Sequence, residues 1–344
     1  MKQSRHPWSE RLIERAVWLA TRVPYRDDVG AVERFLGGHL SASSLGRLIQ
    51  EYGGRLQAAR VAEAVEEAAL PQRGSVVPGE RREATRRGIG VDGALVHIRG
   101  EGWKEVKVAV VFAYAPVCRS SLAAEPDELE TTETMDISAQ SYCACLGDVA
   151  AFEPLQWAEA SRRHLPQAWE QVAISDGAEW IRRLYERNYG QATPVVDWYH
   201  AMEHVWTAGR LVCGEEGPHL KSWVKRRETA LWMGQVHEVV RVIRAEAAAL
   251  SGETQRKLLT EATYFERNAR RMQYQQFREE GLPIGSGMVE GGGCKALVED
   301  RLKETGMRWS RPGAQAMLTL RAELFSQRWE VAWPLACPKF SQLA

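Results

Sequence analysis

The sequence has few cysteines, no net charge and no long apolar run. The six cysteines, at positions 118, 143, 145, 213, 294 and 337, form no C-x-x-C pair, which argues against a zinc ribbon and for a reducing compartment. Forty-five basic and forty-five acidic side chains cancel, so any surface for nucleic acid must be a local patch. No apolar run approaches the ~20 residues of a membrane-spanning helix, and no signal-peptide region is visible. We therefore expect no membrane partner and a cytoplasmic location.

Composition and periodicity predict a helical region at the start of the chain. The 344 residues are 44% hydrophobic, which supports a genuine core and two or three domains. Residues 8 to 70 carry apolar side chains at helical spacing. Gly37 and Gly38 separate a short helix from one that opens between Ser41 and Ser44, a pattern typical of a helix-turn-helix that enters a DNA groove. Helical hairpins without DNA binding are also common, so both interpretations stay open.

A segment punctuated by proline and glycine follows, from residue 71 to residue 87. Its composition predicts an exposed basic linker. It carries five arginines, at positions 73, 81, 82, 86 and 87. These arginines are candidates for contacts with the phosphates of a nucleic acid.

The pattern then changes to strands. They are expected at 88–100, 103–115, about 131–142, 172–175 and 195–196. Asp92 lies inside the first of them, and Asp176 and Asp197 directly follow the last two. Three strands in succession, then strands alternating with helices, predict an α+β fold in which acids at strand ends point into a ligand-binding crevice.

Helical spacing returns in three further stretches: 148–164, 201–275 and a single helix at 317–333. The middle stretch has about 75 residues without a strand. It separates Asp176 from the last acid of interest, Glu290. We therefore expect an all-helical insertion within the sheet domain.

The stretch from Gly281 to Gln315 is the most distinctive of the chain. Ser286 or Gly287 can cap a new helix, so that Glu290 falls in its first turn, where the helix dipole favours a carboxylate. Three glycines follow at 291–293, and each would cost about 1 kcal/mol relative to alanine in a helix interior. They predict that another backbone, or a nucleic-acid strand, approaches closely there. The P-loop order G-x-x-x-x-G-K-[ST] is absent.

Positive charge follows this one acid. The basic side chains are Lys295, Arg301, Lys303, Arg308 and Arg311. An isolated carboxylate among cations and glycines suits a metal-assisted site that acts on phosphodiesters, with partner acids elsewhere in the chain. Trp309 could stack on an unpaired base or could cap the core at a helix end. The alternative for the whole stretch is an ordinary capped helix with a solvated basic face.

Three acids therefore mark a strand, a strand end and a helix start: Asp92, Asp176 and Glu290. Carboxylates placed in this way can hold two Mg²⁺ ions about 3.5 to 4 Å apart, one for the nucleophile and one for the leaving oxygen of a phosphodiester. Without metal the carboxylates repel one another, so at least one of them should have a raised pKa.

Four blocks of the sequence carry a resemblance to a known family. They are VDGALVHIRG, ISDGAEWI, VVDWYHAMEHV and LPIGSGMVEGGGCKALVEDRLKETGMRWSRPGAQAML. Together these blocks resemble the transposases of the Kra insertion-sequence family, a bacterial branch of the Mutator-like DDE transposases. The last block is long enough to be highly specific.

The resemblance implies a ribonuclease-H-like catalytic domain, formed by residues 88–205 and 283–344 and interrupted by a helical insertion at 206–282. An all-α region at 1–70 and the linker at 71–87 precede it. Asp92, Asp176 and Glu290 match the acidic triad of the family, and Asp197-x-x-His200 matches its Asp/Cys-x-x-His motif. The family implies that His200 lies near the scissile strand; a core histidine at a helix start is the alternative.

The resemblance also implies an activity: cleavage at the terminal inverted repeats of an insertion sequence and joining to target DNA. It implies two Mg²⁺ ions, for which Mn²⁺ can substitute, a homo-oligomer on DNA, and a place at the bacterial nucleoid. Two alternatives remain, a metal-dependent nuclease of the same fold without strand transfer, and a retired transposase kept as a DNA-binding protein. The intact triad argues against the retired form.

Overall fold

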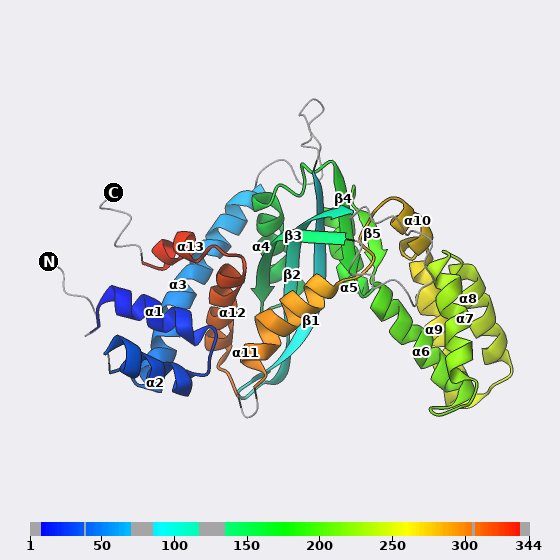
Figure 1. Ribbon diagram of the computed structural model, residues 1–344, viewed down its shortest axis with the longest axis horizontal. Coiled ribbons are helices and arrows are strands. Elements are labelled where there is room, and N and C mark those ends of the chain that lie inside the picture. Colours follow the sequence, from blue (N-terminus) through cyan, green and yellow to red (C-terminus); the bar gives the residue numbers. More distant parts are fainter. Residues whose placement is uncertain (1–7, 38, 70–84, 117–134, 305–306, 338–344) are drawn as a thin grey trace.

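A five-stranded mixed sheet forms the centre of the protein (Figure 1). The computed structural model describes residues 8–37, 39–69, 85–116, 135–304 and 307–337. The strands are β1 (Arg86–Ile98), β2 (Gly102–Pro116), β3 (Met135–Cys145), β4 (Glu170–Ser175) and β5 (Thr193–Val196), in the order β3-β2-β1-β4-β5. The first three strands pair antiparallel, whereas β4 lies parallel to β1 and β5 parallel to β4. The predicted combination of strands and helices is confirmed.

The strands agree with the sequence except at some ends. β3 runs to Cys145, three residues beyond the predicted end, and residues 131–134 lie outside the described part of the chain. Gly100 and Gly102 adopt positive φ angles, 76° and 74°, which lets the chain turn tightly between β1 and β2. Arg86 and Arg87 belong to β1 and not to a linker, whereas residues 71–84 are not described.

Helices cover both faces of the sheet. On one face, α4 (Val149–Arg162) and α5 (Glu179–Asn188) share an apolar core with Ile89 and Val91 of β1. On the other face, η2 (Met288–Glu299) packs on Ala94 and Val96. Since successive strand residues point to opposite faces, Asp92 lies on the same face as Ala94, beneath η2.

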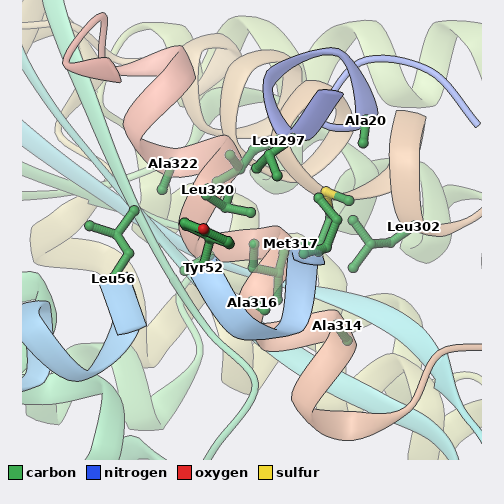
Figure 2. Close-up of a cluster of buried hydrophobic side chains, with 14 of the residues drawn as sticks. Ala20, Tyr52, Leu56, Leu297, Leu302, Ala314, Ala316, Met317, Leu320 and Ala322 are labelled. Atoms are coloured by element: carbon green, nitrogen blue, oxygen red, sulfur yellow. The ribbon is translucent and has the colours of Figure 1, made fainter. Parts of the chain in front are cut away.

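The N-terminal helices share one core with the sheet and the C-terminal helices. They are α1 (Glu10–Ala20), α2 (Tyr25–Leu36) and α3 (Ala42–Ala69). Helices α1 and α2 pack on α3, which in turn packs against α12 (Arg311–Phe325) and α13 (Trp329–Ala336). Figure 2 shows Tyr52 of α3 among side chains of α12. A Cβ placed on Gly53 would lie 2.7 Å from the carbonyl oxygen of Ala316, and the Tyr52 ring stacks on Trp333 at 5.0 Å.

The predicted turn between two helices is present, with Gly37 in the left-handed conformation at the end of α2. However, the predicted recognition helix belongs to the 28-residue α3, one face of which is buried in this shared core. The described helices of residues 8–69 therefore share their hydrophobic core with the sheet and the C-terminal helices.

Between β5 and η2 the chain is helical as far as Glu279, as predicted, and a loop then leads to η2. The helices are α6 (Trp198–Cys213), α7 (Leu220–Trp232), α8 (Val236–Ala248), α9 (Gly252–Asn268), the short η1 (Ala269–Arg271) and α10 (Tyr274–Glu279). We call residues 198–279 the helical segment. It shares its apolar core with side chains of β2, β4 and β5, namely Phe112, Tyr114, Val172, Ile174, Val195 and Val196. The segment lies beyond the β5 edge of the sheet (Figure 1). In the described ranges, no helix is long and apolar enough to cross a bilayer.

The C-terminal tail is two helices, so the prediction of a single one is wrong. After the short α11 (Asp300–Leu302), Ser310 caps α12 by accepting a hydrogen bond from the Gly313 amide. The chain leaves α12 at Ser326, and Gln327 takes a positive φ of 56°. Helix α13 begins two residues later. Glutamine is not among the residues enriched in the left-handed region, so Gln327 gave no sign of the turn and periodicity alone joined the two helices.

Candidate active site

The register of the parallel strands brings three acids to one level of the sheet. Gly90 of β1 lies opposite Ile174 of β4, and Ser175 lies opposite Val196 of β5. Asp92 follows Gly90 by two residues and Asp176 follows Ile174 by two, so these two acids are at the same level. Asp176 also follows Ser175 directly and Asp197 follows Val196 directly, so Asp197 is at that level too. Since neighbouring strands lie about 4.8 Å apart, the backbones of the three acids follow one another across β1, β4 and β5.

Helix η2 brings Glu290 to the same place. Gly90 lies directly under Val289, and a Cβ on Gly90 would overlap the Val289 side chain. The missing side chain therefore lets η2 rest on β1. One turn further along η2, the Cys294 thiol donates a hydrogen bond to Oδ2 of Asp92, with Sγ 3.4 Å from the oxygen. Glu290 lies in the first turn of η2, with Gly287 at the cap position, as predicted.

Two of the three glycines of η2 allow this helix to pack closely on the sheet. A Cβ on Gly292 would lie 2.7 Å from the Tyr142 hydroxyl, and one on Gly293 would lie 3.0 Å from Val108. Gly291 has open space around its Cβ position. The predicted close approach is present at two of the three glycines, where the neighbours are side chains of the sheet and not another backbone. Helix η2 is a π-helix, a rare conformation that is frequent at functional sites.

Asp197 joins the start of α6 to the loop before η2. Its side chain is fully buried, and Oδ1 accepts the His200 amide at 2.8 Å. Oδ2 accepts the Ser286 amide. His200 is thereby held beside the acids, with Nε2 3.3 Å from Oε1 of Glu290 and Nδ1 3.2 Å from Oε2 of Glu203.

One group of three side chains has metal-ligand spacing among the described residues: Asp197, His200 and Glu290, whose ligand atoms lie within 4.8 Å of one another. This group differs from the predicted trio, because it contains Glu290 but not Asp92 or Asp176. Asp197 already accepts two backbone amides, so we regard it as a cap that fixes His200. For Asp92, Asp176 and Glu290 to share an ion, their side chains must approach one another further.

The pKa values of Asp92 and Glu290 are raised, as predicted for at least one of the acids, but the largest cause is burial and not repulsion between carboxylates. Burial raises the pKa of Asp92, and the charge of Asp176 raises it too, whereas the Gly93 amide and the Cys294 thiol lower it. Burial and then Asp197 raise the pKa of Glu290. Both carboxyl groups would therefore gain from a nearby cation.

The pKa of His200 is also raised. Burial alone would lower it, but Asp197, Glu203 and Glu290 together favour the imidazolium form. When protonated, His200 places a positive charge 3.3 Å from Oε1 of Glu290.

The predicted DNA-contacting residues have different positions. Lys295 and Arg308 are exposed, and Lys303 is exposed but paired with Glu299. Arg311 pairs with Glu101 at 2.6 Å. Among the linker arginines, Arg86 pairs with Glu170 at 2.8 Å, and those at 73, 81 and 82 lie outside the described residues.

Arg301 does not lie on the surface. It is 1% exposed, its Nε donates to the Ala20 carbonyl at 2.9 Å, and its guanidinium faces the rings of Tyr25 and Trp309. The expectation that Arg301 contacts phosphate is therefore wrong for this conformation, because α1 and α2 cover it. A basic residue in a basic stretch gives no local sign of such burial.

Trp309 is 7% exposed, and its indole Nε1 donates to the Leu302 carbonyl at 3.2 Å. Trp309 is therefore part of the hydrophobic core, which was the alternative to stacking on an unpaired base.

Two residues near the acids were not predicted. Cys294 follows Glu290 by four positions, so its helical spacing was a usable signal. Tyr264, whose hydroxyl donates to the Asp176 carbonyl at 2.8 Å, comes 88 residues after Asp176 and had no signal in the sequence. Comparison of the chain with protein-family models and with curated proteins finds no match.

Proposed function

We propose that the protein is a metal-dependent DNA transposase of the DDE type, which cleaves insertion-sequence ends and joins them to target DNA. The observation that carries this proposal is the convergence of Asp92, Asp176 and Glu290. They come from the middle of β1, the end of β4 and η2, yet the register and the Asp92–Cys294 contact bring them to the same side of the sheet, beside the carboxyl end of β4. These are the residues that the resemblance to the Kra transposases implies.

The topology supports the ribonuclease-H-like part of the proposal. Three antiparallel strands are followed by two parallel ones, with β1 in the centre. The helical segment lies between β5 and η2 in the chain, where the proposal places an insertion.

The donor set fits a hard divalent cation. Asp92, Asp176 and Glu290 offer carboxylate oxygens, which suit Mg²⁺ or Mn²⁺, and the pKa values of Asp92 and Glu290 are raised by burial. When bound, two such ions would supply an activated hydroxyl nucleophile and neutralise charge on the leaving oxygen. His200 adds one imidazole ligand or, when protonated, a donor to Glu290.

The remaining side chains of the site orient His200 or are available to contact the DNA backbone. Asp197 fixes the first turn of α6, so that His200 points at Glu290. Lys295 follows Glu290 by about one turn of η2 and is exposed, which suits a contact with a backbone phosphate next to the acids. Arg308 is also exposed.

The test uses duplexes taken from the DNA that flanks the gene on both sides, with Mg²⁺ and a supercoiled plasmid as target. Asp92→Asn, Asp176→Asn and Glu290→Gln should each reduce cleavage and joining by about a hundredfold or more, whereas binding to the duplexes persists. Asp148→Asn is the matched control, because Asp148 caps α4 with the same kind of hydrogen bond, 2.8 Å from the Ala151 amide. A variant of the triad that cleaves at the wild-type rate would refute the assignment.

Two other outcomes support the alternatives. Cleavage by the wild type without joining would indicate a nuclease, and binding without cleavage would indicate a retired transposase.

A further inference from the structure

Helix α9 of the helical segment contacts the strand end that carries the second acid. The Tyr264 hydroxyl donates to the backbone carbonyl of Asp176, with a distance of 2.8 Å between the oxygens. On the other side of the same residue, the Asp176 carboxylate accepts the Ala178 amide at 2.7 Å. The turn that presents Asp176 is therefore held by its own backbone and by one side chain from a distant helix.

Gly177 fits this turn closely against α9. Its φ angle is 94°, a conformation that residues with a Cβ rarely adopt. A Cβ placed there would lie 3.2 Å from the Tyr264 ring and 3.2 Å from Nδ2 of Asn268. The turn thus has little room to shift toward α9, and Tyr264 limits its movement in the opposite direction through the hydrogen bond.

Tyr264 is itself held in place by α6. Its ring stacks on the imidazole of His204, with ring centres 3.6 Å apart and an angle of 20° between the planes. Nδ1 of His204 lies 2.6 Å from Oε2 of Glu261. His204 follows His200 by one helical turn, so α6 carries one histidine beside Glu290 and another beside the tyrosine that holds Asp176.

From these contacts we infer that Tyr264 is a positioning residue for Asp176, and that the helical segment is thereby part of the active centre. This inference rests on the proposed function for its catalytic consequence only; the structural coupling is independent of it. Loss of the hydroxyl should leave the fold intact and allow the Asp176 turn to move. The acids would then assemble less readily around a cation, so more divalent metal would be needed for the same rate.

The test compares Tyr264→Phe with Tyr274→Phe. Tyr274 is a matched control because its buried hydroxyl, in the same segment, donates to the Val196 carbonyl at the end of β5, at 3.1 Å. Amide hydrogen exchange, followed by mass spectrometry, should become faster at residues 176–178 in Tyr264→Phe and remain as in the wild type in Tyr274→Phe. In cleavage assays, Tyr264→Phe should need about tenfold more Mg²⁺ for half-maximal rate, which corresponds to one lost hydrogen bond.

The two measurements separate the possible failures. Unchanged exchange at residues 176–178 in Tyr264→Phe would overturn the coupling. Faster exchange with an unchanged Mg²⁺ requirement would overturn the positioning role. If the wild-type protein cleaves no DNA, the proposed function fails. The exchange comparison and the thermal shift caused by Mn²⁺ then still decide whether Tyr264 holds Asp176 where it can bind a metal ion.

Discussion

Asp28 is a buried carboxyl group in the first turn of α2, and its ionisation should control the stability of the N-terminal helices. The side chain is 0% exposed, and neither carboxylate oxygen has a hydrogen-bond partner among the described residues. Burial raises the pKa of Asp28 from 3.8 to about 7, against the opposing effect of Arg301. Asp28 is therefore largely protonated in the folded protein at acidic pH.

The free energy at stake follows from this shift. The difference between 3.8 and about 7, at about 1.4 kcal/mol per unit, amounts to about 4 kcal/mol. The pKa of Asp28 is higher in the folded than in the unfolded protein, so the protonated carboxyl group favours the folded state. This contribution to the free energy of unfolding is fully present below the unfolded pKa and is lost as the pH rises through about 7. Asp28→Asn, which keeps the shape and cannot ionise, should escape this loss.

The assay is urea unfolding followed by circular dichroism. Relative to the wild type, Asp28→Asn should raise the free energy of unfolding by up to about 4 kcal/mol at about pH 8, and by about 2 kcal/mol at about pH 5. Asp27→Asn is the control, since Asp27 lies in the same first turn but is exposed. A gain for Asp28→Asn that does not change with pH, or a loss at the higher pH, would refute the idea that an ionised Asp28 destabilises the folded state.

Three further predictions concern the contact between β1 and η2, the exposed cations Lys295 and Arg308, and Trp309. Gly90→Ala should destabilise the protein by about 1 to 3 kcal/mol through overpacking, and the double variant Gly90→Ala with Val289→Ala should recover most of the loss in the same unfolding assay. Lys295→Ala and Arg308→Ala should each lower the slope of log K against log salt by about 1 for duplex DNA; an unchanged slope would remove that residue from the interface. Trp309→Ala should cost about 3 to 5 kcal/mol of stability and weaken binding to intact and flayed duplexes equally, whereas a loss confined to flayed ends would restore the base-stacking hypothesis.

Local patterns were sufficient for most helices and strands and for the position of each acid within its element. Apolar periodicity depends on neighbours in the chain, so it predicted α4, the helices after β5, and β4 with Asp176 at its end. It failed between α12 and α13, where one left-handed glutamine turns the chain. It also gave no information on which helices share a core, because that depends on contacts between residues far apart in sequence.

The basic stretch after Glu290 shows the same limit. Arg301 and Lys295 are equally plausible phosphate contacts in the sequence, yet only Lys295 is exposed. Arg301 is buried because the Ala20 carbonyl and the Tyr25 ring, some 280 residues earlier in the chain, meet it. Desolvation lowers the pKa of Arg301, in keeping with a guanidinium that serves packing and hydrogen bonding.

The environment of each carboxylate separates the acids that orient the site from those that remain available to a ligand. Asp197 uses both oxygens to accept backbone amides, from His200 and Ser286, and so fixes α6 relative to the loop before η2. Asp92 accepts one amide and one thiol, and a thiol is a weak donor. Asp176 accepts the Ala178 amide through one oxygen only. Ligand binding at Asp92, Asp176 and Glu290 therefore breaks fewer strong hydrogen bonds than binding at Asp197, which favours the first three as cation ligands although Asp197 lies closer to Glu290 in this arrangement.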